Sequence, residues 1–137
     1  MVNPAQAYRS VTTQTASPGQ LILMGFDGAL KFLERARAGF KSRDPLEFNQ
    51  TIHNNVQRTQ AILNELNESL NMEAGGELSS TLRRLYNYFN KRLQDSNRLK
   101  QPQGIDEVIA HLTVLRGAWA QMLEQCTSQP VPTNVTR

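Results

Sequence analysis

The 137-residue sequence contains one cysteine, Cys126, and few aromatic residues. A single cysteine excludes an internal disulfide framework and is typical of proteins kept in a reducing compartment. No apolar run approaches the roughly 20 residues that are needed to span a membrane. Residues 1–10 also lack the basic and apolar regions of a secretion signal. We therefore expect a cytoplasmic protein with an aliphatic core and no membrane insertion.

The sequence has little excess charge of either sign. Its 15 basic and 12 acidic residues leave a formal net charge of +3, which is too small to indicate nucleic-acid binding unless a basic patch is clustered. Arg84, Lys91 and Arg98 recur every seventh residue and would line one face of a helix. We interpret this strip as a solvated face, with a contact for an acidic partner or for nucleic acid as the alternative. No aromatic residues are interleaved with it, so we predict no nucleic-acid partner.

Patterns of metal-binding or catalytic residues are also missing. Gln50 and Val108, rather than glutamate, precede His53 and His111 by three residues, which does not fit the di-iron motif of helical bundles. Cys126 follows His111 by 15 residues on one predicted helix, about 22 Å along its axis and too far for a hydrogen bond. We predict that the protein is not an enzyme, with no catalytic residues, no metal and no cofactor.

Apolar residues recur at intervals of three and four in four segments, and no strand pattern competes with them. Capping signals and glycine-rich or proline-rich breaks separate the segments. The predicted helices run from about Pro18 to Phe40, from Pro45 to Leu70 behind an Asp44 cap, from Glu77 to Leu99, and from Ile105 to Cys126. Similar lengths and short connections predict an all-α, antiparallel up-down four-helix bundle over residues 17–126. We interpret residues 1–16 as a mobile N-terminal arm and residues 127–137 as a disordered tail.

The first predicted helix is more apolar than one buried stripe requires. Ser17, Pro18 and Gln20 form a capping-box start, and the following apolar sector covers about half of the helix. Gly25 and Gly28 would weaken this helix, each by up to about 1 kcal/mol relative to alanine, and are tolerated best where another chain approaches closely. We therefore expect a second chain on this helix, either a copy of the protein or an amphipathic segment of a partner.

Several motifs in fixed order resemble the FliS family of bacterial flagellar secretion chaperones. The stretch AYRSVTTQTASPGQLILMGFDGALKFLERA resembles the family's opening, with its early tyrosine, its T-x-S-P start and its aromatic-Asp-Gly turn. AGGELSSTLRRLYNYFNKRL is similar to the family's glycine-led helix with an L-Y-x-Y element, and VLRGAW matches near the end. The resemblance runs from about Ala7 to Leu123. Gly25 and Phe26 depart from it, because larger apolar residues and tyrosine are usual at these two positions.

The resemblance implies a cytoplasmic chaperone that binds the disordered C-terminal region of flagellin, prevents its premature polymerisation and assists delivery to the flagellar type III export gate. The alternative is a homodimeric structural bundle with another helical client, and weak homodimerisation is compatible with both. Tyr8 would be an anchor of the arm or a removable plug over the first helix. The client-binding residues implied are Tyr8, Leu21, Ile22, Gly25, Phe26, Tyr86 and Tyr88.

Overall fold

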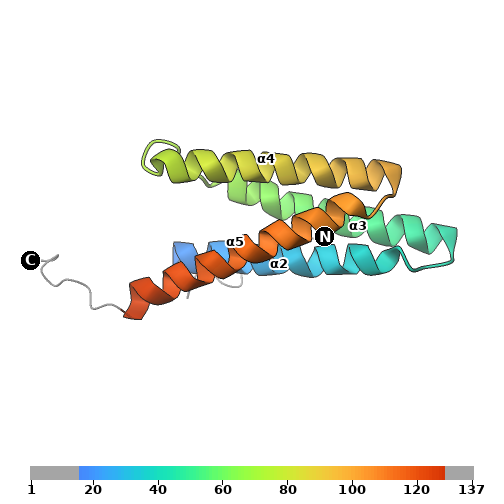
Figure 1. The fold of residues 1–137 in the computed structure, drawn as a ribbon, viewed down its shortest axis with the longest axis horizontal. Coiled ribbons are helices and arrows are strands. Elements are labelled where there is room, and N and C mark those ends of the chain that lie inside the picture. Colours follow the sequence, from blue (N-terminus) through green and yellow to red (C-terminus); the bar gives the residue numbers. More distant parts are fainter. Residues whose placement is uncertain (1–15, 129–137) are drawn as a thin grey trace, which may run out of the picture.

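A computed structural model describes residues 16–128, and this part of the chain is built from four helices joined by short connections (Figure 1). Their bounds are Pro18–Gly39 (α2), Pro45–Glu68 (α3), Gly76–Leu99 (α4) and Gln103–Ser128 (α5). Each boundary lies within two residues of the predicted one. The predicted arm and tail fall almost wholly outside the described residues.

Helix starts follow the capping signals of the sequence. The Ser17 hydroxyl accepts a hydrogen bond from the backbone N–H of Gln20 at 3.2 Å, and the Gln20 side chain accepts one from the N–H of Ser17 at 2.9 Å. The Asp44 carboxylate accepts a bond from the N–H of Leu46 at 3.1 Å. These side chains satisfy N–H groups that have no partner within the first turn of a helix, which explains why α2 and α3 begin where they do.

The four helices form a closed antiparallel ring. Helix α2 packs against α3 and α5, and α4 packs against the same two helices from the other side. This confirms the predicted up-down bundle. Figure 1 shows that α5 starts close to α4 but diverges from it toward its C-terminal end, where it runs beside α2.

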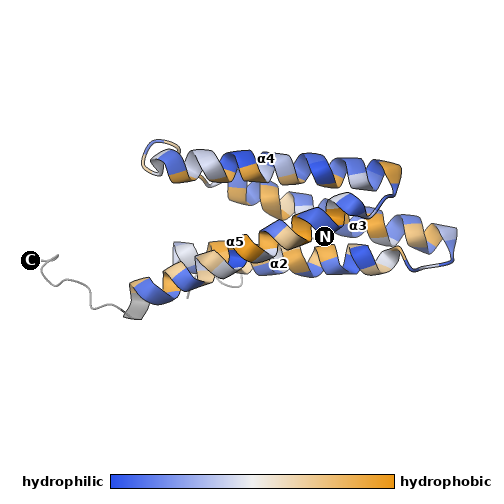
Figure 2. Ribbon diagram, in the orientation of Figure 1, coloured by the Kyte–Doolittle hydropathy of each residue, from blue (hydrophilic) through white to orange (hydrophobic). Residues whose placement is uncertain are grey.

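One hydrophobic core fills the ring. All four helices contribute aliphatic or aromatic side chains that are buried almost completely. Phe26 and Leu33 are two of those from α2. The other core residues are Ala29, Ala36, Ile52, Val56, Ile62, Leu63, Leu66, Leu82, Tyr86, Phe89, Leu93, Ile105, Val108, Ile109 and Leu112. Figure 2 shows the matching pattern, with a largely hydrophilic outer side on α4 and many hydrophobic residues along α5.

The wide apolar sector of α2 is explained in part by its two neighbours. A Cβ atom added to Gly25 would lie 3.1 Å from the Leu66 side chain of α3, and one added to Gly39 would lie 2.9 Å from Thr51. These glycines therefore permit close packing of α2 on α3 within the same chain. The expectation that another chain approaches here is thus met by an intramolecular neighbour, because α2 buries one flank on α3 and the other on α5.

Candidate functional site

An open apolar surface lies where α4 and α5 separate. Phe89 of α4 stacks against His111 of α5, with ring centroids 6.4 Å apart. Continuing this antiparallel register away from the α4–α5 turn pairs Leu85 with Leu115 and Leu78 with Met122. We call these four aliphatic residues, Leu78, Leu85, Leu115 and Met122, the α4–α5 face.

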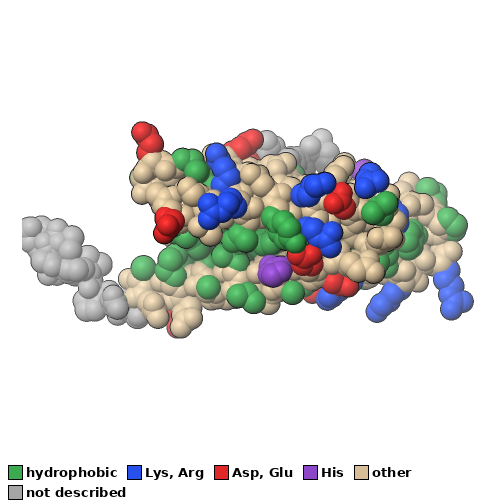
Figure 3. All heavy atoms as spheres, turned by 45° about the horizontal axis from the view of Figure 1, so that its top comes forward, with side chains coloured by type: hydrophobic (Ala, Val, Ile, Leu, Met, Phe, Trp, Pro, Cys, Tyr) green, Lys and Arg blue, Asp and Glu red, His purple; other side chains and the backbone are tan. Residues whose placement is uncertain are grey.

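The exposure of these residues shows that the α4–α5 face is incompletely covered. Leu78 is 53% exposed and Met122 is 37% exposed, although the register places them opposite each other. Leu85 and Leu115 are half-buried against the core. Figure 3 shows a band of hydrophobic side chains between α4 and α5. Apolar positions that face each other without closing leave room for a further apolar element.

Three aromatic residues from three helices lie beside this face. The Phe26 ring of α2 contacts Tyr86 of α4 at a centroid distance of 6.5 Å, and it contacts Trp119 of α5 edge-on at 6.0 Å. The Trp119 indole N–H also donates a 2.9 Å hydrogen bond to the carbonyl of Gly19. Trp119 is half-buried and packed against the core. The aromatic cluster provides a rigid apolar base for the α4–α5 face.

A polar clamp around Glu107 marks the point at which α4 and α5 begin to part. The Glu107 carboxylate accepts hydrogen bonds from the Tyr88 hydroxyl and from Nε of Arg92, the latter at 2.7 Å. His111 lies one turn further along α5, with its Nε2 atom 3.9 Å from the same carboxylate. The hydrogen bonds from Tyr88 and Arg92 lower the pKa of Glu107, and the bond to Glu107 raises the pKa of Tyr88. The clamp therefore joins a negatively charged carboxylate on α5 to two donors on α4.

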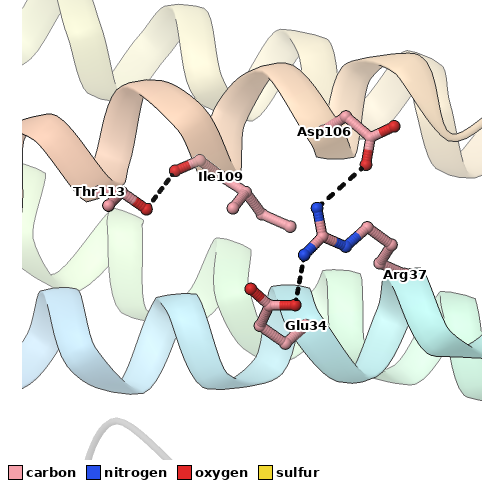
Figure 4. Close-up of polar contacts among 5 residues, drawn as sticks. All are labelled: Glu34, Arg37, Asp106, Ile109 and Thr113. Carbon is pink, nitrogen blue, oxygen red and sulfur yellow. Dashed lines mark hydrogen bonds and ion pairs between the residues drawn. The ribbon is translucent and has the colours of Figure 1, made fainter.

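Beyond His111, α5 makes polar contacts with α2. Arg116 of α5 contacts both carboxylate oxygens of Asp27 at 2.7 and 3.4 Å. Nearer the start of α5, Arg37 reaches from α2 to Asp106 at 3.5 Å and also contacts Glu34 at 2.6 Å (Figure 4). These contacts fix α5 along α2 over its length, which explains why its C-terminal half does not follow α4.

The structure separates the residues implied as client contacts by their accessibility. Tyr8 lies outside the described residues. Leu21 and Ile22 are half-buried near the start of α2, and Tyr88 is 46% exposed at the edge of the α4–α5 face. Three others, Gly25, Phe26 and Tyr86, are buried in the bundle, where Phe26 and Tyr86 contact each other.

Sequence reasoning did not identify the four residues of the α4–α5 face as candidate contacts. The spacing of apolar residues places Leu78, Leu85, Leu115 and Met122 on the same sides of their helices as the core residues, so periodicity alone does not distinguish them from the core. The signal that could have found them was the antiparallel register, which pairs apolar positions along the whole of both helices. Only the divergence of α5 shows which of these pairs stay open.

Other kinds of site are less well supported by the geometry. Within residues 16–128, no three His, Cys, Asp or Glu side chains are grouped closely enough to hold a metal ion. Cys126 is exposed near the end of α5. None of the described helices combines the length and apolar character that crossing a membrane requires.

Comparison with known proteins supports the resemblance noted from the motifs. The family model described as "Flagellar protein FliS" matches residues 1–126. The chain is 34% identical over 122 residues to the flagellar secretion chaperone FliS of Bacillus subtilis, covering 89% of this chain and 87% of that protein. It is 34% identical over 128 residues to the flagellar secretion chaperone FliS of Salmonella typhimurium, covering 90% and 93%. The match includes nearly all of the bundle, with both sides of the α4–α5 face, and the chain therefore belongs to the FliS family of flagellar secretion chaperones.

Proposed function

We propose that this protein is a cytoplasmic, non-enzymatic chaperone that binds the disordered C-terminal region of flagellin. Binding would prevent premature polymerisation and assist delivery of flagellin to the flagellar type III export apparatus. The α4–α5 face carries this proposal, because it is an open apolar surface in a chain that belongs to a family of secretion chaperones. A segment that is disordered when free can fold as an amphipathic helix on such a surface.

The client helix would lie on the α4–α5 face, between α4 and the diverging C-terminal half of α5. Leu78 and Met122 would then bury their exposed portions, and burying a whole leucine or methionine side chain contributes about 1.5–3 kcal/mol. The Tyr88 ring lies at the edge of the face, where it can add an aromatic contact while its hydroxyl stays bound to Glu107. The buried Phe26 and Tyr86 would act by shaping the base of this surface, without direct contact.

A second client contact would involve Leu21 and Ile22 near the start of α2, as the family resemblance implies. Tyr8 and the arm of residues 1–16 would cover this part of the bundle until the client displaces them. Deleting residues 2–14 should then strengthen client binding. Unchanged affinity would contradict a masking role of the arm.

The primary test is calorimetry of the full chain against a peptide of the last roughly 40 to 60 residues of the organism's flagellin, at several temperatures. Folding of the peptide on an apolar surface should give one-to-one, enthalpically favourable binding with a large negative heat-capacity change. Absence of binding at high micromolar concentration would contradict the proposed client.

A matched pair of leucine variants locates the contact. Leu78→Asp places a charge on the α4–α5 face, and Leu46→Asp makes the same change at the start of α3, toward the other end of the bundle. Both leucines are more than half exposed, so both variants should stay folded. We expect Leu78→Asp to weaken peptide binding about tenfold or more because the charge is desolvated in the complex, and Leu46→Asp to have little effect.

The same variants test the homodimeric alternative. Light scattering would show whether the chain forms a stable dimer. If Leu78→Asp dissociates that dimer, and the dimer does not bind the flagellin peptide, the α4–α5 face serves self-association. Binding that is unaffected by Leu78→Asp but lost in Leu21→Asp or Ile22→Asp, with the bundle still folded, would move the contact to α2.

A further inference from the structure

A second surface with a defined geometry lies on the outer side of the α2–α3 contact. Phe32 of α2 is half-buried there, and two arginines from different helices lie over its ring. The guanidinium carbon of Arg35 is 5.6 Å from the ring centroid, and that of Arg58 of α3 is 5.8 Å from it. We call Phe32, Arg35 and Arg58 the Phe32 platform. Cation–π contacts hold both guanidinium groups while leaving their N–H edges available for hydrogen bonds.

The cations of this platform lack the polar partners that most other cations of the described chain have. Across residues 16–128, Arg35, Arg43 and Arg58 are the arginines for which no ion pair or hydrogen bond is found. The remaining six, Arg37, Arg83, Arg84, Arg92, Arg98 and Arg116, each contact a carboxylate or another polar acceptor. Lys31 lies one turn before Arg35 on α2, is exposed, and likewise has no ion pair within the described chain. By contrast, Arg37 of α2 lies between Glu34 and Asp106 of α5 (Figure 4).

Carboxylates of α2 and α3 do not compensate this positive charge. Asp27 is engaged with Arg116, and Glu34 with Arg37. On α3, Glu47 and Glu68 lie about 16 and 15 Å from Arg58 along the helix axis, and Glu65, which has a contact of its own, lies about 10 Å away. The arginines of the platform therefore lack an acidic neighbour within hydrogen-bonding reach along their helices.

The positive charge of the platform is confined to a small area. Arg35, Arg58 and the nearby Lys31 are three cations, and the whole chain has a formal net charge of only +3. A nucleic-acid backbone is bound through many phosphate contacts along an extended basic surface, whereas two guanidinium groups suffice to pair with two carboxylates of a short segment. The small size of the patch therefore favours an acidic polypeptide segment over nucleic acid.

We infer that the Phe32 platform binds an acidic segment of a partner polypeptide. Each guanidinium can bind a carboxylate in a bidentate manner, and stacking on Phe32 reduces the conformational freedom lost on binding. The platform lies along the α3 side of α2, whereas the contacts of α2 with α5 use Asp27 and Arg37. The acidic segment would therefore bind apart from the α4–α5 face, and this inference does not require flagellin to be the client.

The test uses the full chain and a fluorescein-labelled hexaglutamate peptide, with binding followed by fluorescence anisotropy at low salt. Arg35→Gln combined with Arg58→Gln should weaken binding about tenfold or more, because two charge-assisted bidentate contacts are lost. The matched control is Arg84→Gln combined with Arg98→Gln, which removes the same charge from exposed positions on α4. We expect this control to change the affinity less than about twofold, as distant exposed charges are screened. Arg35→Lys with Arg58→Lys should lose part of the affinity, because lysine keeps the charge without the planar fork.

Three results would overturn the inference. One is the absence of saturable peptide binding by the unaltered chain. Another is an equal loss of affinity in both double glutamine variants, which would indicate general electrostatic attraction. The third is tighter binding of a 20-base-pair DNA duplex, or of vesicles of phosphatidylglycerol, that depends on Arg35 and Arg58, since the platform would then bind phosphate. Circular dichroism of each variant checks that the bundle remains folded.

Discussion

Two glycines of α5 lie in opposite environments and should respond oppositely to alanine. A Cβ atom added to Gly104 would lie 2.6 Å from the carbonyl oxygen of Arg92 and 3.0 Å from Cβ of Ser96, both on α4. A Cβ atom added to Gly117 would have nothing within 4 Å. The backbones of α4 and α5 therefore approach closely at Gly104, near the Glu107 clamp, while Gly117 faces open space.

The expected free energies follow from this difference. Alanine in the interior of a helix is favoured over glycine by about 1 kcal/mol, so Gly117→Ala should raise the free energy of unfolding by about that amount. Gly104→Ala must push α5 away from a backbone carbonyl, which cannot rotate aside, and overpacking of this kind costs about 1–3 kcal/mol. Because Gly104 lies in the first turn, its gain in helix propensity is smaller. We expect a net loss of about 1–2 kcal/mol.

Urea unfolding followed by circular dichroism, supported by calorimetry, measures both variants. For a domain of this size the melting temperature should fall by about 4–8 °C in Gly104→Ala and rise by about 4 °C in Gly117→Ala. A Gly104→Ala variant as stable as the unaltered protein would refute the close approach of α4 and α5 at this position. A destabilised Gly117→Ala variant would show that this side of α5 is covered.

Two further predictions concern ionisable contacts between helices. Because hydrogen bonds lower the folded-state pKa of Glu107 from its ordinary value of 4.5, its stabilising contribution is present above that value and is lost as the pH falls through the depressed one. Glu107→Gln should therefore flatten the acid side of a plot of unfolding free energy against pH, and an unchanged slope would contradict the clamp. Asp27→Asn should reduce the unfolding free energy by less than about 1 kcal/mol, since the Arg116 pair is partly exposed. This difference should shrink in about 1 M salt, as measured by urea unfolding, and a difference that does not shrink would argue against a Coulombic origin.

The helices and their order were predictable because their signals are local. The capping box at Ser17 and the cap at Asp44 act within one turn of helix. The recurrence of apolar residues at intervals of three and four positions is likewise a property of each segment by itself. The motifs that resemble the FliS family are also read along the chain, and the family match confirms them. Short connections between helices of similar length then favour the antiparallel bundle.

The candidate sites were only partly predictable. Periodicity assigns Leu78 and Met122 to the inner sides of their helices, yet both remain exposed because α5 diverges from α4. The apolar surplus assigned to the first helix is buried in part on two neighbours of the same chain. The Phe32 platform joins Arg35 and Arg58 from different helices, and no spacing along the sequence indicates that one ring would hold both.

The sequence by itself therefore determined the four helices, their ends, the bundle and the family. Only the tertiary structure decided which apolar positions are covered and which stay open. The physical reason is that the contacts that orient α5 join residues far apart in the sequence. Arg116 and Asp27 are separated by 89 residues, and Trp119 and Gly19 by 100. Local propensities act over a few residues, but the angle between two helices depends on side chains that meet only in the folded chain.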